Sequence, residues 1–395
     1  MNQDISCRIL LITGELSGDL YGHLLIKRIR EINPAFHFLG IGGPRIRSLG
    51  IEVLFSSESL SLVGLPGPRD LKKYWFVYKK IEDILKRKKV DVVILVDFPG
   101  FNLRIAKLAR KLGYPVIYYV APQVWAWHRR RINILRNCVD RLYVILPFEE
   151  NFFSRYGIKT IFLGHPILDL LEVKLAEELF YEVYGFRKDF PLISFFPGSR
   201  EGEVKRHIPL FLKIFEELKE KIPHVQGIMV KAESLEESPL WETARGVLKV
   251  IEGSQYEVLK YSTVAVLASG TITLESALLQ TPAVVTYSLP SWMIFLAKKL
   301  VKVPYISLAN LILEKEVYPE VVEEKRKRSL IVEKVVELVK KEEKRKKMQK
   351  ELHRIKEIIG SPGASWRIAE DIVKFIYELK KREFGIEVKK ETLAK

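Results

Sequence analysis

The sequence predicts a two-domain α/β protein in which parallel strands alternate with helices. Uninterrupted apolar runs such as Val92–Val96 and Leu192–Phe196 are typical of strands buried on both faces, as in parallel sheets covered by helices. Helix-like stretches separate these runs, and the alternation restarts after residue 184. A chain of 395 residues is also too long for one comfortable core, so two doubly wound domains are expected.

The first domain is expected over residues 1–168. A helix over 20–32 should follow its first strand. Five apolar runs predict its strands: 9–12, 36–41, 92–96, 116–120 and 142–146. Strands of this kind place ligand-binding loops at their carboxyl ends.

The second domain is expected over residues 185–345, after a boundary within 168–190. Four runs predict its strands: 192–196, 228–230, 264–268 and 283–287. Residues 346–395 are polar and helical in pattern, and they should return to the first domain or be exchanged in a dimer. Two facing domains predict a cleft, a preferred place for small molecules.

The composition narrows the choice of partner and compartment. The net charge of +16 favours an anionic partner, which leaves a nucleic acid, a phosphorylated substrate or an acidic membrane surface. Part of this charge lies in runs where Glu alternates with Lys and Arg, typical of a solvated helical face. The two cysteines, Cys7 and Cys138, are far apart and predict a reducing, cytoplasmic compartment. Neither a signal peptide nor a membrane-spanning run is expected.

Asp97 is the first candidate catalytic residue, because it ends a buried strand, where a charge is costly. Pro99 and Gly100 then turn the chain. A half-desolvated carboxylate at a strand end suits a general base, and Asn102 could orient it. The alternative is that Asp97 caps a helix beginning near Phe101.

A turn in the second domain suits a diphosphate. Gly198 would let a phosphate approach the backbone, Ser199 offers a hydroxyl, and Arg200 offers a charged fork that stabilises a departing diphosphate. The alternative is a capped helix start with an exposed arginine.

A later turn repeats this arrangement. Ser269, Gly270 and Thr271 follow the strand over 264–268, and small residues at a helix start can present backbone N–H groups to an anion. Glu275 lies one turn on and could accept hydrogen bonds from ribose hydroxyls. The alternative for Glu275 is a simple favourable interaction with the helix dipole.

Two first-domain motifs have open interpretations. Residues 14–19 contain Gly14 and Gly18 but not the GxGxxG spacing of dinucleotide sites, and Asp19 could simply cap the next helix. In residues 121–131, Trp125 and Trp127 beside basic residues suggest a sugar or phosphate platform, or a nucleic-acid patch. The alternative is that both rings are packed between sheet and helix. His128 and His165 lack a ligand partner at i+4, so no metal is expected.

Residues 60–80 combine apolar and basic side chains. The aromatic group Trp75, Phe76 and Tyr78 lies among Lys72, Lys73, Lys79 and Lys80. This composition suits an interfacial membrane element, and an amphipathic helix covering the sheet is equally consistent with it.

Taken together and in this order, the motifs resemble those of the lipid-A-disaccharide synthase family. They are GELSGD (14–19), GIGGPR (40–45), VDFPGFN (96–102), YVAPQVWAWHRRR (119–131), LPFE (146–149), FLGHP (162–166), PGSREGEV (197–204), ASGTITLE (268–275) and YISLANLI (305–312). The likeness covers about residues 8–320. It implies an inverting glycosyltransferase of the GT-B fold, two Rossmann-like domains facing across a cleft, without metal or cofactor.

The resemblance also implies a reaction and a location. A 2,3-diacylglucosamine would pass from UDP to the 6-hydroxyl of 2,3-diacylglucosamine 1-phosphate, giving a β-1,6-linked disaccharide 1-phosphate. The enzyme would be cytoplasmic and peripheral on the inner face of the inner membrane, without nucleic acid, as a homodimer that exchanges C-terminal helices. A UDP-sugar 2-epimerase-like enzyme and a basic nucleic-acid-binding protein are the alternatives.

By the same resemblance, Asp97 matches the general base and Arg200 a diphosphate contact with Ser199 beside it. The matched UDP-binding residues are Ser269, Gly270, Thr271, Glu275 and Asn310, and the matched acceptor-side residues are Glu15, Ser17 and Asp19. Two positions depart from the family pattern: Leu16, where a smaller residue or Thr is frequent, and Glu323, where Gln is usual. A carboxylate at 323 would disfavour a nearby diphosphate.

Overall fold

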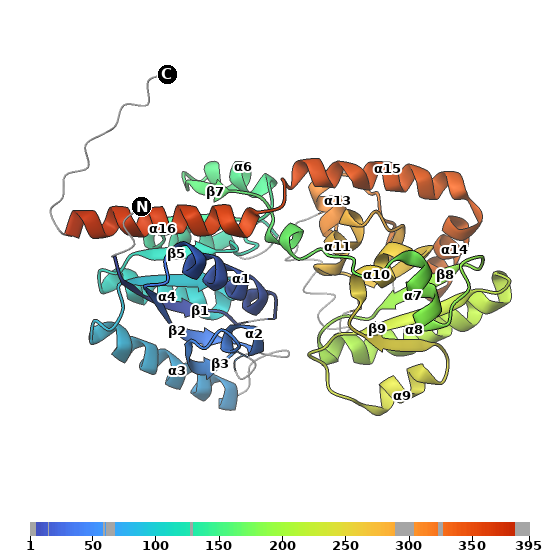
Figure 1. The fold of residues 1–395 in the computed structure, drawn as a ribbon, viewed down its shortest axis with the longest axis horizontal. Coiled ribbons are helices and arrows are strands. Elements are labelled where there is room, and N and C mark those ends of the chain that lie inside the picture. Colours follow the sequence, from blue (N-terminus) through green and yellow to red (C-terminus); the bar gives the residue numbers. More distant parts are fainter. Residues whose placement is uncertain are drawn as a thin grey trace, which may run out of the picture. The chain divides into compact units, whose positions relative to one another are not determined.

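The computed structural model describes residues 5–14, 16–57, 60, 68–126, 129–288, 304–322 and 327–383. The chain divides into two compact units. The first comprises Met1–Asp169 and Gly360–Lys395, and the second Leu170–Ile359. Each unit holds a parallel sheet with intervening helices, so the expected α/β architecture of two doubly wound domains is confirmed (Figure 1).

The sheet of the first unit has seven strands in the order β3-β2-β1-β4-β5-β6-β7 among the described residues. The strands are β1 (Cys7–Ile12), β2 (Phe36–Gly42), β3 (Glu52–Ser56), β4 (Val92–Val96), β5 (Val116–Tyr119), β6 (Arg141–Val144) and β7 (Thr160–Phe162). All pairs are parallel. The strand order reverses between β1 and β4, and ligands bind beside such a switch point.

Helices cover both faces of this sheet. Successive residues of one strand therefore point alternately into two hydrophobic cores, one on each face. On one face Leu10 and Ile12 pack with α3, α4 and α5, and on the other Ile9 and Leu11 pack with α1 and α16. The helices are α1 (Leu16–Ile32), α2 (Pro44–Arg47), α3 (Pro68–Lys86), α4 (Pro99–Lys111), η1 (Arg129–Arg131), α5 (Ile132–Cys138), α6 (Phe148–Ser154), η2 (Pro166–Asp169) and α16 (Ala364–Glu383).

The last helix, α16, returns to the first unit, where Figure 1 shows it lying along α1. Its apolar face is fully buried, and the carboxylate of Asp169 accepts hydrogen bonds from the N–H groups of Gly363 (2.5 Å) and Ser365 (2.7 Å) at its start. This contact satisfies backbone donors that an uncapped helix start leaves without partners.

The second unit contains a six-stranded parallel sheet in the order β10-β9-β8-β11-β12-β13 among its described residues. The strands are β8 (Leu192–Phe196), β9 (Gln226–Lys231), β10 (Lys249–Glu252), β11 (Val264–Ala268), β12 (Ala283–Thr286) and β13 (Glu320–Val321). The order reverses between β8 and β11, so the predicted turns after these two strands lie beside the switch point.

The second unit extends past the expected boundary at residue 345. Helix α15 packs on α11 and α13, and α14 packs on α8. The helices are α7 (Glu177–Tyr184), α8 (Glu201–Lys221), α9 (Pro239–Arg245), α10 (Gln255–Tyr261), α11 (Ile272–Leu278), α13 (Leu308–Leu313), α14 (Lys327–Lys340) and α15 (Glu342–Ile358). None of the helices in the described ranges is both long and apolar enough to cross a membrane.

Candidate active site

Asp97 lies on a strained turn directly after β4. Asp97 and Phe98 both have left-handed backbone conformations, with φ of +46° and +51°. The Asp97 N–H donates to the carbonyl of Tyr119 (3.0 Å), and its own carbonyl accepts from the Tyr118 hydroxyl (2.6 Å) and the Asn102 amide (2.8 Å). Neighbouring groups therefore hold a conformation that non-glycine residues disfavour, a kind of strain that clusters at functional sites.

The structure changes two interpretations of this turn that the sequence had suggested. Helix α4 begins at Pro99 with Phe98 in the N-cap position, so Asp97 precedes the capping residue. Asn102 is fully buried, and its amide nitrogen donates to backbone carbonyls, including those of Ile12 and Asp97. Asn102 thus holds the backbone of the turn, which differs from the expectation that it orients the carboxylate.

The turn after β1 packs against the Asp97 turn. A Cβ on Gly14 would lie 2.0 Å from Cγ of the Phe98 ring, so only glycine fits beside that ring. Asp19 is 1% exposed, and its carboxylate accepts from the N–H groups of Gly43 (2.5 Å) and Arg45 (3.0 Å). Asp19 therefore caps the start of α2, whereas the sequence had suggested that it caps the helix following it.

The predicted acceptor-side residues differ in exposure. Ser17 is half-buried in the first turn of α1. Trp125 is 8% exposed, its ring edge contacts Phe148 at a centroid distance of 5.1 Å, and its Nε1–H donates to Glu149 (3.0 Å). Trp125 is thus packed, as the alternative interpretation expected, and forms no open platform. Four of the residues singled out lie outside the described residues: Glu15, Trp127, His128 and Glu323.

In the second unit, the turn after β8 presents two exposed polar side chains, Ser199 and Arg200. Gly198 has φ of +114°, and α8 begins at Glu201 with Arg200 at the N-cap. The Glu203 carboxylate lies behind the turn, accepting from the Ser199 N–H (3.2 Å) and pairing with the Arg200 guanidinium (3.3 Å). An exposed guanidinium at the N-terminus of a long helix suits an anionic ligand.

Replacing Gly198 by Ala is expected to destabilise the protein by about 2–3 kcal/mol and to weaken the UDP binding that the family resemblance implies for this turn. A Cβ there would lie 2.5 Å from Oε2 and 2.8 Å from Cβ of Glu203, and the latter atom cannot swing away by side-chain rotation; the strain of a positive φ adds to this clash. Thermal unfolding and calorimetric titration with UDP measure the two effects.

Gly185 provides the matched control, because it also has positive φ (+67°) but nothing within 4 Å of an added Cβ. Gly185→Ala should cost only about 1 kcal/mol and leave UDP binding unchanged. Equal losses for the two variants would contradict the role given to the Glu203 contact.

The second predicted turn is tied to the segment that precedes α13. The Ser269 hydroxyl donates to the carbonyl of Ile306 (2.6 Å). The Thr273 hydroxyl donates to the carbonyl of Gly270 (2.8 Å) and accepts from the N–H of Leu308 (3.1 Å). These bonds join two motifs that lie more than thirty residues apart in the sequence.

Glu275 lies beneath this turn, in α11, whose N-cap is the half-buried Thr271. Its carboxylate is 9% exposed and accepts from the Gln255 side chain (3.3 Å). Burial raises the pKa of the Glu275 carboxyl to about 7. A buried carboxylate that has lost its water needs hydrogen-bond donors, and the hydroxyls of a bound ligand can supply them.

Asn310 is fully buried, and both ends of its side-chain amide form hydrogen bonds with other groups of the protein. Its nitrogen donates to the carbonyl of Tyr318 and to the Glu320 carboxylate (both 2.8 Å). Its oxygen accepts from the N–H groups of Val317 (2.8 Å) and Tyr318 (2.9 Å). Asn310 therefore holds residues 317–320, and the Glu320 carboxylate in turn accepts from the N–H groups of Ile306 and Ser307 beside the Ser269 turn, an indirect positioning role that the sequence pattern did not reveal.

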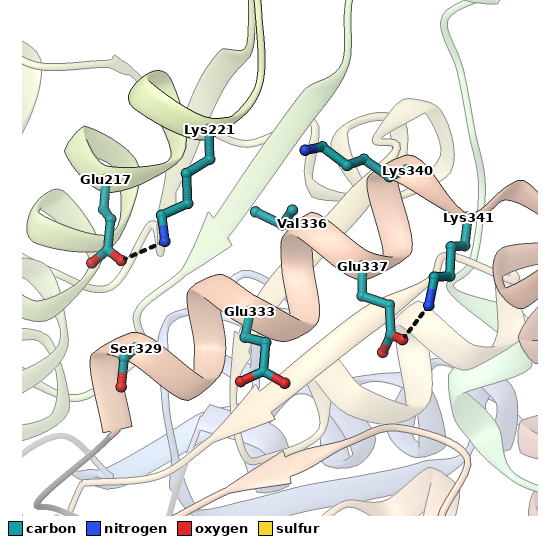
Figure 2. A pocket seen from close by; sticks show the side chains of 8 residues that line it. All are labelled: Glu217, Lys221, Ser329, Glu333, Val336, Glu337, Lys340 and Lys341. Atoms are coloured by element: carbon teal, nitrogen blue, oxygen red, sulfur yellow. Dashed lines mark hydrogen bonds and ion pairs between the residues drawn. The ribbon is translucent and has the colours of Figure 1, made fainter.

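A surface hollow lies elsewhere in this unit, between α8 and α14 (Figure 2). Glu217 pairs with Lys221 there, and Glu337 pairs with Lys341, so its charges are largely compensated. It contains none of the predicted site residues. Within the described ranges, no group of three or more His, Cys, Asp or Glu side chains is arranged to hold a metal ion.

Comparison with known proteins identifies related sequences. A family model described as "Lipid-A-disaccharide synthetase" matches residues 9–366. The lipid-A-disaccharide synthase of Trichlorobacter lovleyi is 34% identical over 376 residues, covering 93% of this chain and 97% of that protein. The synthase of Nitrosococcus oceani is 36% identical over 366 residues, covering 92% and 94%.

Among solved structures, a putative UDP-N-acetylglucosamine 2-epimerase from Listeria monocytogenes is similar in fold, with a TM-score of 0.64. The match covers 95% of this chain and 98% of that chain at 12% sequence identity. At this identity the likeness concerns the fold alone.

Proposed function

The chain belongs to the lipid-A-disaccharide synthetase family and is a glycosyltransferase that uses a UDP-sugar, and we propose the following reaction and residue roles for it. The donor is UDP-2,3-diacylglucosamine, and the acceptor is the 6-hydroxyl of 2,3-diacylglucosamine 1-phosphate. The products are UDP and the β-1,6-linked disaccharide 1-phosphate. The family match over residues 9–366 carries this proposal and favours it over a 2-epimerase, whose similarity is limited to the fold.

The transfer is a single inverting displacement. As the acceptor oxygen bonds to the anomeric carbon, the bond from that carbon to the diphosphate oxygen breaks, and its electron pair leaves with UDP. Asp97 takes the proton of the attacking hydroxyl, a role suited to a half-buried carboxylate at a strand end. Arg200, with Ser199 beside it, stabilises the charge that develops on the departing diphosphate.

The remaining matched residues bind or position the substrates. Ser269, Gly270 and Thr271 contact the UDP moiety, and Glu275 accepts from its ribose hydroxyls. Asn310 acts on the nucleotide side indirectly, by holding Glu320, whose carboxylate fixes residues 306 and 307 beside the Ser269 turn. On the acceptor side we assign the first-unit residues Glu15, Ser17, Asp19, Trp125 and Trp127. Asp19 acts through its cap of α2, and the packed Trp125 acts by positioning the loop that carries it.

Incubation of the purified protein with both diacylated substrates, followed by mass spectrometry, tests this function. The disaccharide 1-phosphate and UDP should appear together, at the same rate with and without EDTA. Absence of the disaccharide would exclude the proposed reaction, whereas loss of activity in EDTA would exclude only a metal-independent transfer. A parallel incubation with UDP-N-acetylglucosamine, in which the 2-epimer is sought, tests the epimerase alternative.

Helix α3 supports attachment to an anionic membrane surface. Its inner face, including Val77 and Ile81, is buried in the core of the first unit. Its outer face exposes Leu71, Trp75 (63%) and Phe76 (59%). Exposed lysines lie among them: Lys72, Lys73, Lys79 and Lys80. Apolar anchors within a basic face are typical of helices that lie in a membrane interface, and we place this helix on the inner face of the inner membrane. The rest of the 60–80 segment, residues 61–67, lies outside the described residues.

Replacing Trp75 and Phe76 together by Ala should weaken binding to vesicles of phosphatidylglycerol and phosphatidylethanolamine by at least about tenfold. The substitutions remove apolar area that inserts into the interface and leave every lysine in place. Co-sedimentation with the vesicles measures the effect. Trp366 on α16, which is 39% exposed, provides a control whose replacement by Ala should leave binding unchanged. Equal binding by the double variant and the parent would rule out α3 as the anchor.

The homodimer with exchanged C-terminal helices stays a prediction. Within one chain α16 packs on α1, so exchange would replace this contact by the same contact between two copies. Sedimentation velocity gives the oligomeric state directly.

A further inference from the structure

Glu149 is a buried carboxyl that the proposed reaction does not use. It lies just after β6, in the first turn of α6, and is 1% exposed. Its Oε2 accepts from the N–H groups of Leu146 (3.0 Å) and Ile145 (3.2 Å). Its Oε1 accepts from the Trp125 Nε1–H (3.0 Å). One carboxyl therefore joins the turn after β6 to the loop after β5.

The sheet order brings this carboxyl near Asp97. Strands β4, β5 and β6 are adjacent, with Val96 opposite Tyr119 and Tyr119 opposite Tyr143. Asp97 follows β4 and Glu149 follows β6, so both lie at the carboxyl edge of the sheet, with the Trp125 loop leaving β5 between them. Parallel strands are about 4.8 Å apart, which places the two strand ends within about 10 Å of each other.

The charges of the two carboxyls are coupled. Burial raises the pKa of Glu149 to about 7, the hydrogen bonds from Trp125, Leu146 and Ile145 oppose this rise, and the charge of Asp97 adds to it. Tyr118 of β5 also interacts electrostatically with Asp97, and Arg131 of η1 interacts with Tyr118. A charge on Asp97 therefore opposes the ionisation of Glu149, and a charge on Glu149 equally opposes a second negative charge at Asp97.

From this geometry we infer that Glu149 is a positioning residue for the transfer, holding the Trp125 loop and coupled in charge to Asp97. The inference rests on the proposed role of Asp97 as the base. Below about pH 7 Glu149 is largely protonated and carries no charge. As Glu149 loses its proton, its charge disfavours a second negative charge nearby and makes Asp97 a stronger proton acceptor.

The pH dependence of kcat tests the coupling, because kcat reports groups that titrate in the enzyme–substrate complex. In that complex the bound ribose occupies Glu275, the other carboxyl described here whose pKa burial raises to about 7. The parent should show an inflection near pH 7, where Glu149 ionises. Glu149→Gln should lose that inflection and lower kcat by about tenfold, since the variant is permanently neutral. Trp125→Phe removes the indole donor but not the carboxyl, so it should keep an inflection, moved to higher pH.

Glu257 in the second unit provides a matched control. It is also a buried glutamate that accepts backbone N–H bonds, from Lys174 (2.6 Å) and Leu175 (3.3 Å). Glu257→Gln should retain the parental inflection. An inflection that survives in Glu149→Gln, or disappears equally in Glu257→Gln, would overturn the inference.

A second measurement separates this inference from the proposed function. The emission of Trp125, obtained as the difference between the parent and Trp125→Phe, should titrate near pH 7. The midpoint should fall in Asp97→Asn and the titration should vanish in Glu149→Gln. A midpoint unmoved in Asp97→Asn overturns the coupling. Full activity of Asp97→Asn with a shifted midpoint overturns the catalytic role of Asp97 and leaves the coupling standing.

Discussion

Asp97→Asn is expected to lower kcat by about a thousandfold or more while UDP affinity and folding stay close to those of the parent. Asparagine has the same shape but cannot take the proton of the attacking hydroxyl, and general base catalysis contributes about 10²–10⁴-fold. The turn should survive the change, because the bonds from Tyr118 and Asn102 reach the backbone carbonyl at this position. Steady-state kinetics and calorimetric titration with UDP provide the two readouts.

Asp91 offers the matched control for this variant. It precedes β4, at the opposite end of the same strand, where its carboxylate accepts from the Arg8 N–H (2.7 Å) and pairs with Lys380 (2.9 Å). Asp91→Asn should retain the parental kcat, although its lost ion pair lowers stability slightly. Turnover of Asp97→Asn within tenfold of the parent would remove Asp97 from the reaction.

Arg200→Ala is expected to weaken UDP binding about tenfold or more and to lower kcat by about a hundredfold. The guanidinium is the charge that the proposal places at the departing diphosphate, and losing one such donor typically costs 10²–10³ in kcat. The protein should fold normally, because the Arg200 side chain is 55% exposed and its pair with Glu203 is only partly desolvated.

Two further variants sharpen this test. Arg200→Lys keeps the charge but loses the planar fork, so it should recover binding more than turnover. Arg187, in the same unit, is exposed and pairs with Asp189 (2.9 Å), and its replacement by Ala should change neither quantity. If Arg200→Ala binds UDP as the parent does, the diphosphate lies elsewhere.

Much of the fold was predictable from periodicity. Central strands such as β4 and β11 are apolar at every position, because both faces of the sheet are covered. The edge strands were not predicted, because they lack such a continuous apolar run. Strand β3 is half-exposed along its length, and β13 has two residues, so neither produces an apolar run. The C-terminal boundary was also missed, because α14 and α15 share the polar, charged composition of a solvated helix while packing in the second unit.

The candidate site was likewise predictable only in part. Glycines and acids after apolar runs located the turns at Asp97, Gly198 and Ser269, because parallel strands place such turns at one edge. The partners of those turns were not predictable. Glu149 is an unremarkable acid in the sequence, and its contact with Trp125 joins positions 24 residues apart. One sequence feature could have identified Glu149, namely its position three residues after the predicted strand over 142–146.

By itself, the sequence determined the doubly wound architecture, the family and the turns that carry the candidate catalytic groups, because these depend on local pattern and motif order. Only the tertiary structure decided what each polar side chain does. Asp19 caps α2, Asn102 holds the Asp97 backbone, and Asn310 holds Glu320, which bonds the segment beside Ser269. The physical reason is that a buried polar group must find a partner, and the sheet order and helix packing, rather than the neighbouring residues in the chain, determine which partner is within reach.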